Sequence, residues 1–109
     1  MAVIDNLLKM FNQGQDNVLL RFSLGNEFFK AENLPEAERH LRAALEHDPK
    51  YSAAWKVLGK VLTAAGRHAE AVEVFDKGIL VAEERGDIQA AKEMRVFQKR
   101  SNKALQAEN

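Results

Sequence analysis

Residues 52–83, SAAWKVLGKVLTAAGRHAEAVEVFDKGILVAE, repeat residues 18–49, VLLRFSLGNEFFKAENLPEAERHLRAALEHDP, at a distance of 34 positions along the chain. Identical residues recur at this distance: Leu24-Gly25 and Leu58-Gly59, Ala31 and Ala65, Glu36-Ala37 and Glu70-Ala71. Bulky apolar residues also correspond, with Phe28 matched by Leu62 and Leu41 by Phe75. Self-similarity at a fixed period is typical of repeat architectures, so the sequence predicts two copies of one supersecondary unit.

Hydrophobic spacing and chain-breaking residues predict six helices and no strand. The expected helices cover about residues 2–12, 17–31, 35–48, 51–65, 68–85 and 88–104. Pro35 suits a first helical turn, where its missing N–H needs no partner. Pro49, Gly66 and Gly86 lie at the expected breaks. We therefore expect an all-α chain in which short turns join consecutive helices.

The two copies resemble the tetratricopeptide-repeat family, whose pattern is W-x2-L-G-x2-Y, then A-x3-F, then P. The second copy reads Trp55-x2-Leu58-Gly59-x2-Leu62 and Ala71-x3-Phe75, and the first reads Leu24-Gly25-x2-Phe28, Ala37-x3-Leu41 and Pro49. The resemblance implies a right-handed stack of antiparallel helical hairpins, an α-α superhelix. Residues 1–109 would form one domain, with repeats at 18–49 and 52–85. The small residues Gly25 and Gly59 would allow close helix crossings.

Two repeats are fewer than the three or so that a stack normally needs, so the terminal helices acquire a structural role. The N-terminal helix, 2–12, carries one apolar face. Its members are Ile4, Leu7, Leu8 and Phe11. The following helix is apolar on almost every side and needs a cover, which this face supplies. A mobile segment that covers the groove and a dimer contact are the alternatives for helix 2–12.

The last helix, 87–105, is predicted to cap the stack. It has Lys92-Glu93 where a third repeat would have the Leu-Gly pair. Its apolar face comprises Ala90, Ala91, Met94, Phe97 and Leu105, and its basic face comprises Lys92, Arg95, Lys99 and Lys103. We interpret the basic face as a solvated outer surface. A contact surface for an acidic partner, a phosphate backbone or anionic lipid is the alternative.

The resemblance also places a partner-binding groove on the first helix of each repeat. Residues that share one helix face would line it. They are Leu19, Phe22, Asn26, Phe29 and Lys30 from the first repeat and Ala53, Lys56, Lys60 and Thr63 from the second. Core packing under the N-terminal helix is the alternative for the two phenylalanines, and ordinary solvation is the alternative for Lys56 and Lys60.

Asn26 follows the Leu-Gly pair, as does an asparagine in family members that hold the C-terminal carboxylate of chaperones. Those members also carry a lysine one turn earlier and a second asparagine in the next repeat. Phe22 and Val57 stand at the two corresponding positions here. The two-carboxylate grip is therefore not reproduced, and apolar contact to Phe22 and Phe29 is as good an expectation as an ion pair to Lys56 or Lys60.

Composition argues against several other classes of protein. The 109 residues include 16 basic and 16 acidic side chains, so net charge gives no reason to expect nucleic acid or a membrane surface as a partner. The chain has no cysteine, which excludes disulfides, thiol nucleophiles and cysteine metal sites. The start, MAVID, lacks the basic region of a signal peptide, and no apolar stretch approaches 20 residues. We expect a cytoplasmic protein.

The sequence offers no catalytic residues and no metal ligands. Glu36 precedes His40 by four residues and His47 follows by seven, but a zinc site needs three or four ligands. We interpret His40, His47 and His68 as surface residues of amphipathic helices. No catalytic motif or phosphate loop is present. We expect no enzyme activity and no cofactor.

These expectations favour an adaptor that binds a protein or peptide partner in its concave groove. The alternative is an assembly protein whose apolar surface closes a homodimer or a fixed complex. A weak homodimer is compatible with either function. The sequence does not identify the partner.

Overall fold

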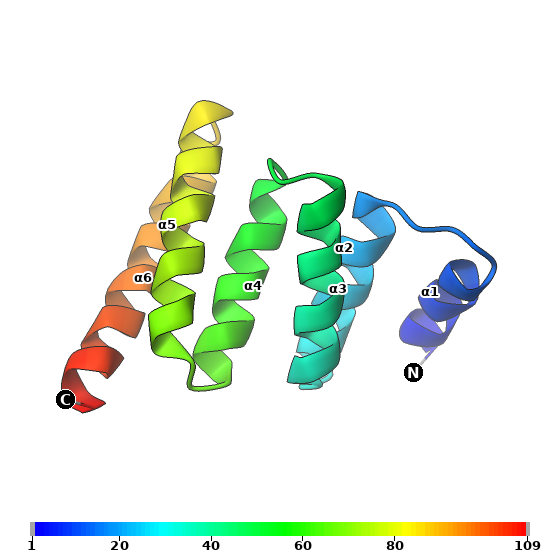
Figure 1. Cartoon of the computed structure of the whole chain (residues 1–109), viewed down its shortest axis with the longest axis horizontal. Coiled ribbons are helices and arrows are strands. Elements are labelled where there is room, and N and C mark those ends of the chain that lie inside the picture. The colour runs from blue at the N-terminus through cyan, green and yellow to red at the C-terminus, as the bar shows by residue number, and fades with distance from the viewer. Residues whose placement is uncertain (1, 109) are drawn as a thin grey trace.

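Six helices follow one another along residues 2–108, the part of the chain that this computed structural model describes (Figure 1). They are α1 (Ala2–Asn12), α2 (Val18–Lys30), α3 (Leu34–His47), α4 (Ser52–Ala64), α5 (His68–Glu84) and α6 (Ile88–Glu108). No strand occurs in this range. The expected all-α fold is confirmed, and each helix lies within a few residues of its predicted range.

The helices pack as a stack of antiparallel hairpins, as the repeat predicts. α2 pairs with α3 and α4 with α5, while α1 packs on α2 and α6 packs on α5 (Figure 1). The two ends of the chain consequently lie at opposite ends of the stack. α4 also contacts α2 and α6 directly, so these three helices form one layer. We call α2, α4 and α6 the first-helix layer.

The helix ends follow from local side-chain chemistry. Asn17 precedes α2, and its Oδ1 accepts a hydrogen bond from the Leu20 N–H at 2.9 Å. Such caps satisfy backbone donors that a helix leaves without partners in its first turn. At the other ends, Gly66 after α4 and Gly86 after α5 have φ of 77° and 74°. Glycine adopts this left-handed conformation without the steric penalty of a side chain, so the chain turns sharply there.

Small residues allow the helices of each hairpin to cross closely. A Cβ placed on Gly25 would lie 2.5 Å from Cγ of Leu41, and a Cβ on Gly59 would overlap the ring of Phe75. Both neighbours are fully buried and have little room to move. The close helix crossings expected at these two glycines are therefore confirmed. Gly78 of α5 plays the same part, because a Cβ there would lie 2.7 Å from Cβ of Trp55.

α6 covers the exposed side of α5. Met94 is fully buried against Gly78, and the ring of Phe97 stacks on Phe75 with centroids 6.1 Å apart. The repeat interval of 34 residues places Glu93 of α6 where α2 and α4 carry their crossing glycines, Gly25 and Gly59. α6 therefore lacks the small residue that allows a close crossing with a following helix. The guanidinium of Arg95 forms an ion pair with Glu83 of α5.

The basic face expected on α6 is not entirely free. Arg95 is held by Glu83, as described above, whereas Lys92, Lys99 and Lys103 are exposed and have no ion pair within the described residues. The side-chain amide of Gln98 donates to the Val72 carbonyl at 3.1 Å, which ties the same turn of α6 to α5.

α1 packs against the first repeat through its apolar face, which includes the ring of Phe11. Ile4 is buried, and Leu7, Leu8 and Phe11 are partly buried against the core. The guanidinium of Arg21 lies 4.3 Å from the centroid of the Phe11 ring, a distance typical of a cation–π contact. Residues 2–12 therefore lie against α2, with the apolar face that the sequence indicated.

His40 is buried, so the interpretation of all three histidines as surface residues is wrong. Its side chain is 0% exposed, between the rings of Phe28 and Phe11 at 5.6 and 5.9 Å. His47 is exposed, whereas the side chain of His68 is only 16% exposed. A polar residue every few positions along α3 suggested solvation, but α1 and α2 bring apolar rings over His40 that the periodicity of α3 cannot reveal.

An ionic cluster adjoins His40 through Arg21. The carboxylate of Asp16 lies 2.8 Å from Nε of Arg21 and 2.9 Å from Nε2 of His47. Hydrogen bonds from Arg21 and then from His47 lower the pKa of Asp16 to about 2. Asp16 precedes α2 and His47 ends α3, so the cluster links the two helices of the first repeat at one end.

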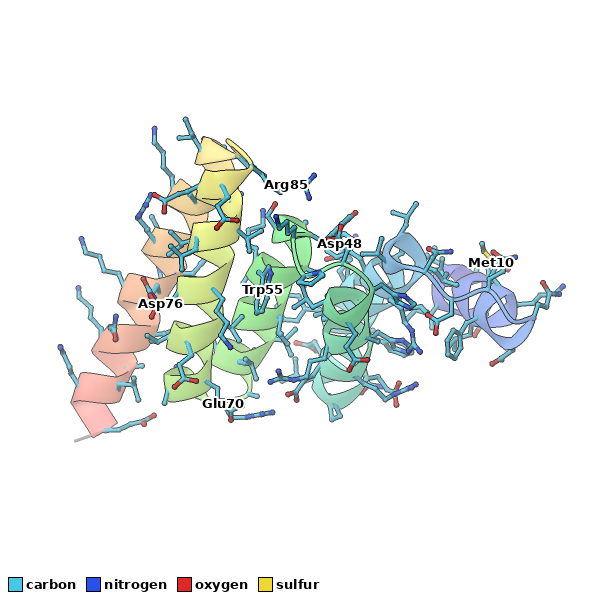
Figure 2. The ribbon with its side chains drawn as sticks, turned by 45° about the horizontal axis from the view of Figure 1, so that its top comes forward. Met10, Asp48, Trp55, Glu70, Asp76 and Arg85 are labelled. Carbon is cyan, nitrogen blue, oxygen red and sulfur yellow. The ribbon has the colours of Figure 1, made fainter. Side chains whose placement is uncertain are left out.

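The turn between α3 and α4 is fixed by two side chains of the second repeat. Figure 2 shows Trp55 on α4 and Arg85 beyond α5 close to this turn, near Asp48. The indole Nε1 of Trp55 donates to the Pro49 carbonyl at 2.7 Å, and Nη1 of Arg85 donates to the Lys50 carbonyl at 2.7 Å. These bonds hold the end of the first repeat against the second.

None of the helices within residues 2–108 combines the length and the apolar character that crossing a bilayer requires.

Candidate partner-binding groove

The residues that the sequence assigns to a groove lie on α2 and α4, in the first-helix layer. They fall into three groups by their surroundings. Phe29, Lys60 and Thr63 meet at one pocket, Lys30 and Lys56 are held in ion pairs, and Leu19, Phe22, Asn26 and Ala53 lie elsewhere along the two helices. Only part of the expected set is therefore brought together at one place.

The pocket has a volume of about 220 Å³ and spans all three helices of the first-helix layer. Its lining residues are Phe29, Lys60, Thr63, Ala64, Phe97 and Arg100. We call it the aromatic pocket. Phe29 comes from α2 and Phe97 from α6, and both rings are only partly buried. The pocket therefore offers apolar surface that no other part of the described chain covers.

Two cations lie over the rings of the aromatic pocket. Nζ of Lys60 is 5.8 Å from the centroid of the Phe29 ring and 5.2 Å from that of Phe97. Cζ of Arg100 is also 5.8 Å from the centroid of Phe97. These distances suit cation–π attraction, which holds a charge beside an aromatic face without neutralising it. Neither Lys60 nor Arg100 forms an ion pair within the described residues.

The polar group inside the aromatic pocket is already engaged. The hydroxyl of Thr63 donates to the Gly59 carbonyl at 2.9 Å and lies 3.0 Å from the Ser101 hydroxyl, which is fully buried. A hydroxyl has one proton to donate. Thr63 consequently ties α4 to α6 rather than offering a donor to a ligand.

The other lysines expected in the groove are compensated by carboxylates. Nζ of Lys30 lies 3.1 Å from Oε2 of Glu27, one turn earlier in α2. Nζ of Lys56 lies 3.4 Å from Oε1 of Glu93, so this pair joins α4 to α6. Of the three lysines that the sequence brought forward, only Lys60 has no ion pair within residues 2–108.

Phe22 packs against Tyr51 and is not available as a fully exposed side chain. Its ring lies 5.3 Å from that of Tyr51, at the start of α4, and it is half-buried. This contact is between the repeats and not under α1, where the alternative interpretation had placed it. Asn26 is half-buried as well, and Leu19 is 62% exposed.

Sequence reasoning missed three residues of the aromatic pocket, Ala64 of α4 and, on α6, Phe97 and Arg100. Phe97 was assigned to the buried face of a capping helix and Arg100 was not considered. The available signal was their spacing, because residues three apart share one side of a helix. A helix that follows two repeats also occupies the first-helix position, so its inner side continues the same surface.

Among residues 2–108, no three His, Asp or Glu side chains are placed to share a metal ion. The carboxylates with lowered pKa, such as Glu38, are in salt bridges: hydrogen bonds from Arg67 lower its pKa, and those from Arg42 add to the effect. Arg67 bonds Glu38 and Glu70 together, which joins the two repeats on their second helices.

Similarity to known proteins agrees with the fold and the repeat. Residues 22–86 match the family described as tetratricopeptide repeat (TPR). A TPR repeat-containing protein of Pseudomonas aeruginosa is 45% identical over 102 residues, which cover 94% of this chain and 97% of that protein.

Solved structures give the same result. Protein BPP2914 from Bordetella parapertussis is 45% identical, has a TM-score of 0.84, and is matched over 94% of this chain and 90% of its own. The TPR2B domain of yeast Sti1, solved in a complex with pHsp70, has a TM-score of 0.86 over 92% of this chain and 80% of its own, at 18% identity, and so shares the fold alone. This chain belongs to the tetratricopeptide-repeat family.

Proposed function

We propose that the protein is a non-catalytic interaction module that binds a peptide or protein segment across the first-helix layer. The single observation that carries this proposal is the aromatic pocket, where α2, α4 and α6 together leave two rings partly uncovered. Partly exposed aromatic side chains in a concave site are typical anchors for a partner. The groove of the proposal is the surface of α2, α4 and α6 that faces away from α3 and α5.

Family membership supports the proposal. TPR domains generally mediate protein–protein interactions, and the TPR2B domain of Sti1 forms a complex with pHsp70. We extend this mode of action to the present chain as an adaptor of the cytoplasm. The partner in our proposal is not the C-terminal carboxylate of a chaperone, because Phe22 and Val57 stand where family members that hold this group carry a lysine and a second asparagine.

A random-peptide display screen followed by NMR mapping tests the proposal. Peptides selected on the folded protein are added to the ¹⁵N-labelled chain. The largest shifts are expected at the amides of Phe29, Lys60 and Phe97. Shifts confined to α3 and α5 would place the site on the opposite layer and overturn the proposal.

A matched pair of variants strengthens this test. Phe29→Ala removes an anchor and should weaken binding more than Lys60→Ala, because a few apolar anchors dominate such interfaces. Each variant is compared with the parent chain by thermal unfolding before a loss of binding is assigned to the groove. Equal binding by the parent chain and a folded Phe29→Ala variant would contradict the role given to Phe29.

The assembly alternative makes a different prediction for the same sample. If an apolar surface closes a homodimer, light scattering after size exclusion gives twice the mass of one chain at tens of micromolar protein. A monomer that binds selected peptides is the outcome expected from the groove. A stable dimer that binds no peptide would replace the interaction module with the assembly function.

A further inference from the structure

We propose that the aromatic pocket takes one apolar side chain of a partner segment, and that an acidic side chain adjacent to it in the segment pairs with Lys60 and Arg100. The inference rests on the proposed function and specifies the chemistry of the partner. It stands on three features of the pocket: its size, its lining and its uncompensated charge.

Size selects a side chain rather than a free small molecule. The aromatic pocket measures about 220 Å³. Clefts that enclose drug-sized ligands have volumes of about 300–1,000 Å³. The smaller volume suits a single large side chain, such as leucine, methionine or phenylalanine, inserted from an extended or helical segment that lies across the helices.

The lining selects an apolar side chain. The rings of Phe29 and Phe97 and the methyl group of Ala64 provide the contact surface. The hydroxyl of Thr63 is engaged by the Gly59 carbonyl and the Ser101 hydroxyl. A polar side chain placed against these rings would lose its water and find no free donor on Thr63, which is unfavourable.

Charge selects an acidic neighbour. Lys60 and Arg100 are the two cations at the pocket, and within the described residues no carboxylate neutralises either of them. Elsewhere in the first-helix layer the cations Lys30 and Lys56 have their carboxylates within 3.1 and 3.4 Å. The chain as a whole has net charge zero, so the excess at the pocket is local.

The charges around the pocket indicate on which side of the apolar anchor the acidic residue of the partner lies. Lys103 lies about one turn after Arg100 in α6 and has no ion pair within the described residues. On the other side, an adjoining hollow beyond Phe29 is lined by Glu32 and by Lys30, whose charge is compensated by Glu27. An acidic residue of the partner would be attracted toward α6 and repelled on the side of Glu32. The acidic residue therefore lies on the α6 side of the apolar anchor.

Basic side chains beside aromatic rings also occur in proteins that bind single-stranded nucleic acid, where bases stack on the rings. The zero net charge of this chain and the small volume of the pocket favour a side chain over a nucleobase. An acidic, apolar peptide is therefore the partner that we propose, and a nucleic acid is an outcome that the test can detect.

Blocked synthetic peptides test the inference. Two peptides have an acetylated N-terminus and an amidated C-terminus, with a central leucine and, beside it, glutamate or glutamine. A third peptide ends in leucine with a free carboxylate, and a single-stranded oligonucleotide is the fourth probe. Binding is followed by ¹⁵N NMR. The glutamate peptide should bind roughly threefold to tenfold more tightly than its glutamine twin, as two partly exposed ion pairs allow.

Variants of the protein identify the charges responsible. The double variant Lys60→Met, Arg100→Met keeps the aliphatic stems and should bind the two peptides equally. The control Lys50→Met, Lys77→Met removes the same net charge from exposed positions outside the pocket and should preserve the difference. Thermal unfolding of both double variants confirms that they are folded.

The outcomes separate the inference from the proposed function. Equal binding of the glutamate and glutamine peptides in the aromatic pocket overturns the acidic preference and leaves the interaction module standing. Preference for the free C-terminal carboxylate, or for a single-stranded oligonucleotide, also overturns the inference. If neither these peptides nor any peptide selected from the display screen shifts the amides of Phe29 and Phe97, both the inference and the groove are wrong.

Discussion

The imidazole of His40 lies flat against the phenyl ring of Phe28, with the two planes 4° apart and their centroids separated by 5.6 Å. Its nitrogens are 3.0 Å from Nη1 of Arg21 and 3.2 Å from Nη2 of Arg39. A neutral imidazole accepts at one nitrogen, and a protonated one would accept at neither and face two cations. Burial first, and then Arg39 and Arg21, lower the pKa of His40 to about 4, although Glu36 and Asp16 oppose them.

This environment predicts a loss of stability in mild acid. The pKa of His40 is 6.5 in the absence of these effects and about 4 in the fold, so between these values the unfolded chain binds a proton that the folded chain does not. The free energy of unfolding therefore falls as the pH falls from about 6.5 toward 4. From pH 7 to pH 5 we expect a loss of roughly 1–2 kcal/mol in urea unfolding.

Two variants assign that loss. His40→Phe keeps a flat ring on Phe28 but cannot titrate, so its stability should change much less between pH 7 and pH 5. His47→Gln removes the exposed histidine of the same helix and should retain the loss. The carboxylate of Asp16 titrates at lower pH and does not contribute in this range. A pH dependence that is identical in the parent and in His40→Phe would assign the effect to other groups.

A second prediction concerns the helix crossing at Gly59. A leucine at this position would drive its side chain into the fully buried ring of Phe75. Overpacking of this kind costs about 1–3 kcal/mol or more, so Gly59→Leu should lower the melting temperature clearly. Ala69→Leu, at an exposed position of α5, introduces the same side chain into a helix and should have little effect.

Gly14 is not suited to serve as that control, although it lies in a polar turn. Its φ is 93°, a conformation that L side chains rarely adopt, so a substitution there strains the backbone even where space is open. Equal melting temperatures for Gly59→Leu and Ala69→Leu would contradict the close crossing.

The sequence predicted the fold well because its information is local and repeated. The recurrence of Leu-Gly pairs 34 residues apart predicted close helix crossings at Gly25 and Gly59. The structure confirms them, because a Cβ at either glycine would overlap a side chain of the partner helix. Gly78 was overlooked, although Ala44 precedes it by the same interval and is also fully enclosed. A small residue at both positions was the available signal.

Features that depend on three helices at once were not predictable. Three separate helices form the surroundings of His40, because Phe11 and Phe28 belong to α1 and α2. The aromatic pocket likewise depends on how α6 lies against α4, which brings Phe97 near Lys60. Periodicity assigns a residue to a face of its own helix, but it does not give the angle at which the next helix crosses.

A third prediction concerns α6 as the cap of the stack. Met94 is fully buried, and Met94→Ala should cost about 2–5 kcal/mol because it leaves a cavity beside Gly78. Deletion of residues 87–109 would uncover Phe75, and we expect aggregation or loss of cooperative unfolding, since a repeat stack needs its caps. Circular dichroism and light scattering during heating measure both effects.

Deletion of residues 106–109 alone is the control for the cap, because residues 106–108 are exposed. A chain that ends at Gly86 and still melts sharply as a soluble monomer would remove the structural role of α6. The basic residues of α6 would then become the first candidates for a purely functional role.

The last prediction uses the ion pair between Lys56 and Glu93, which are 3.4 Å apart on α4 and α6. Glu93 is 41% exposed, so Glu93→Gln should change the free energy of unfolding by less than about 1 kcal/mol. It would free the charge of Lys56 beside Lys60, and an acidic peptide in the groove should bind roughly twofold to fivefold more tightly. The glutamine twin of that peptide should bind unchanged, and the gain should shrink at about 0.5 M salt.

Glu83→Gln makes the same change of charge at the partner of Arg95, on α5, and should leave affinity as it was. An equal gain from Glu83→Gln and Glu93→Gln would mean that net charge, and not the arrangement of cations around the aromatic pocket, governs binding.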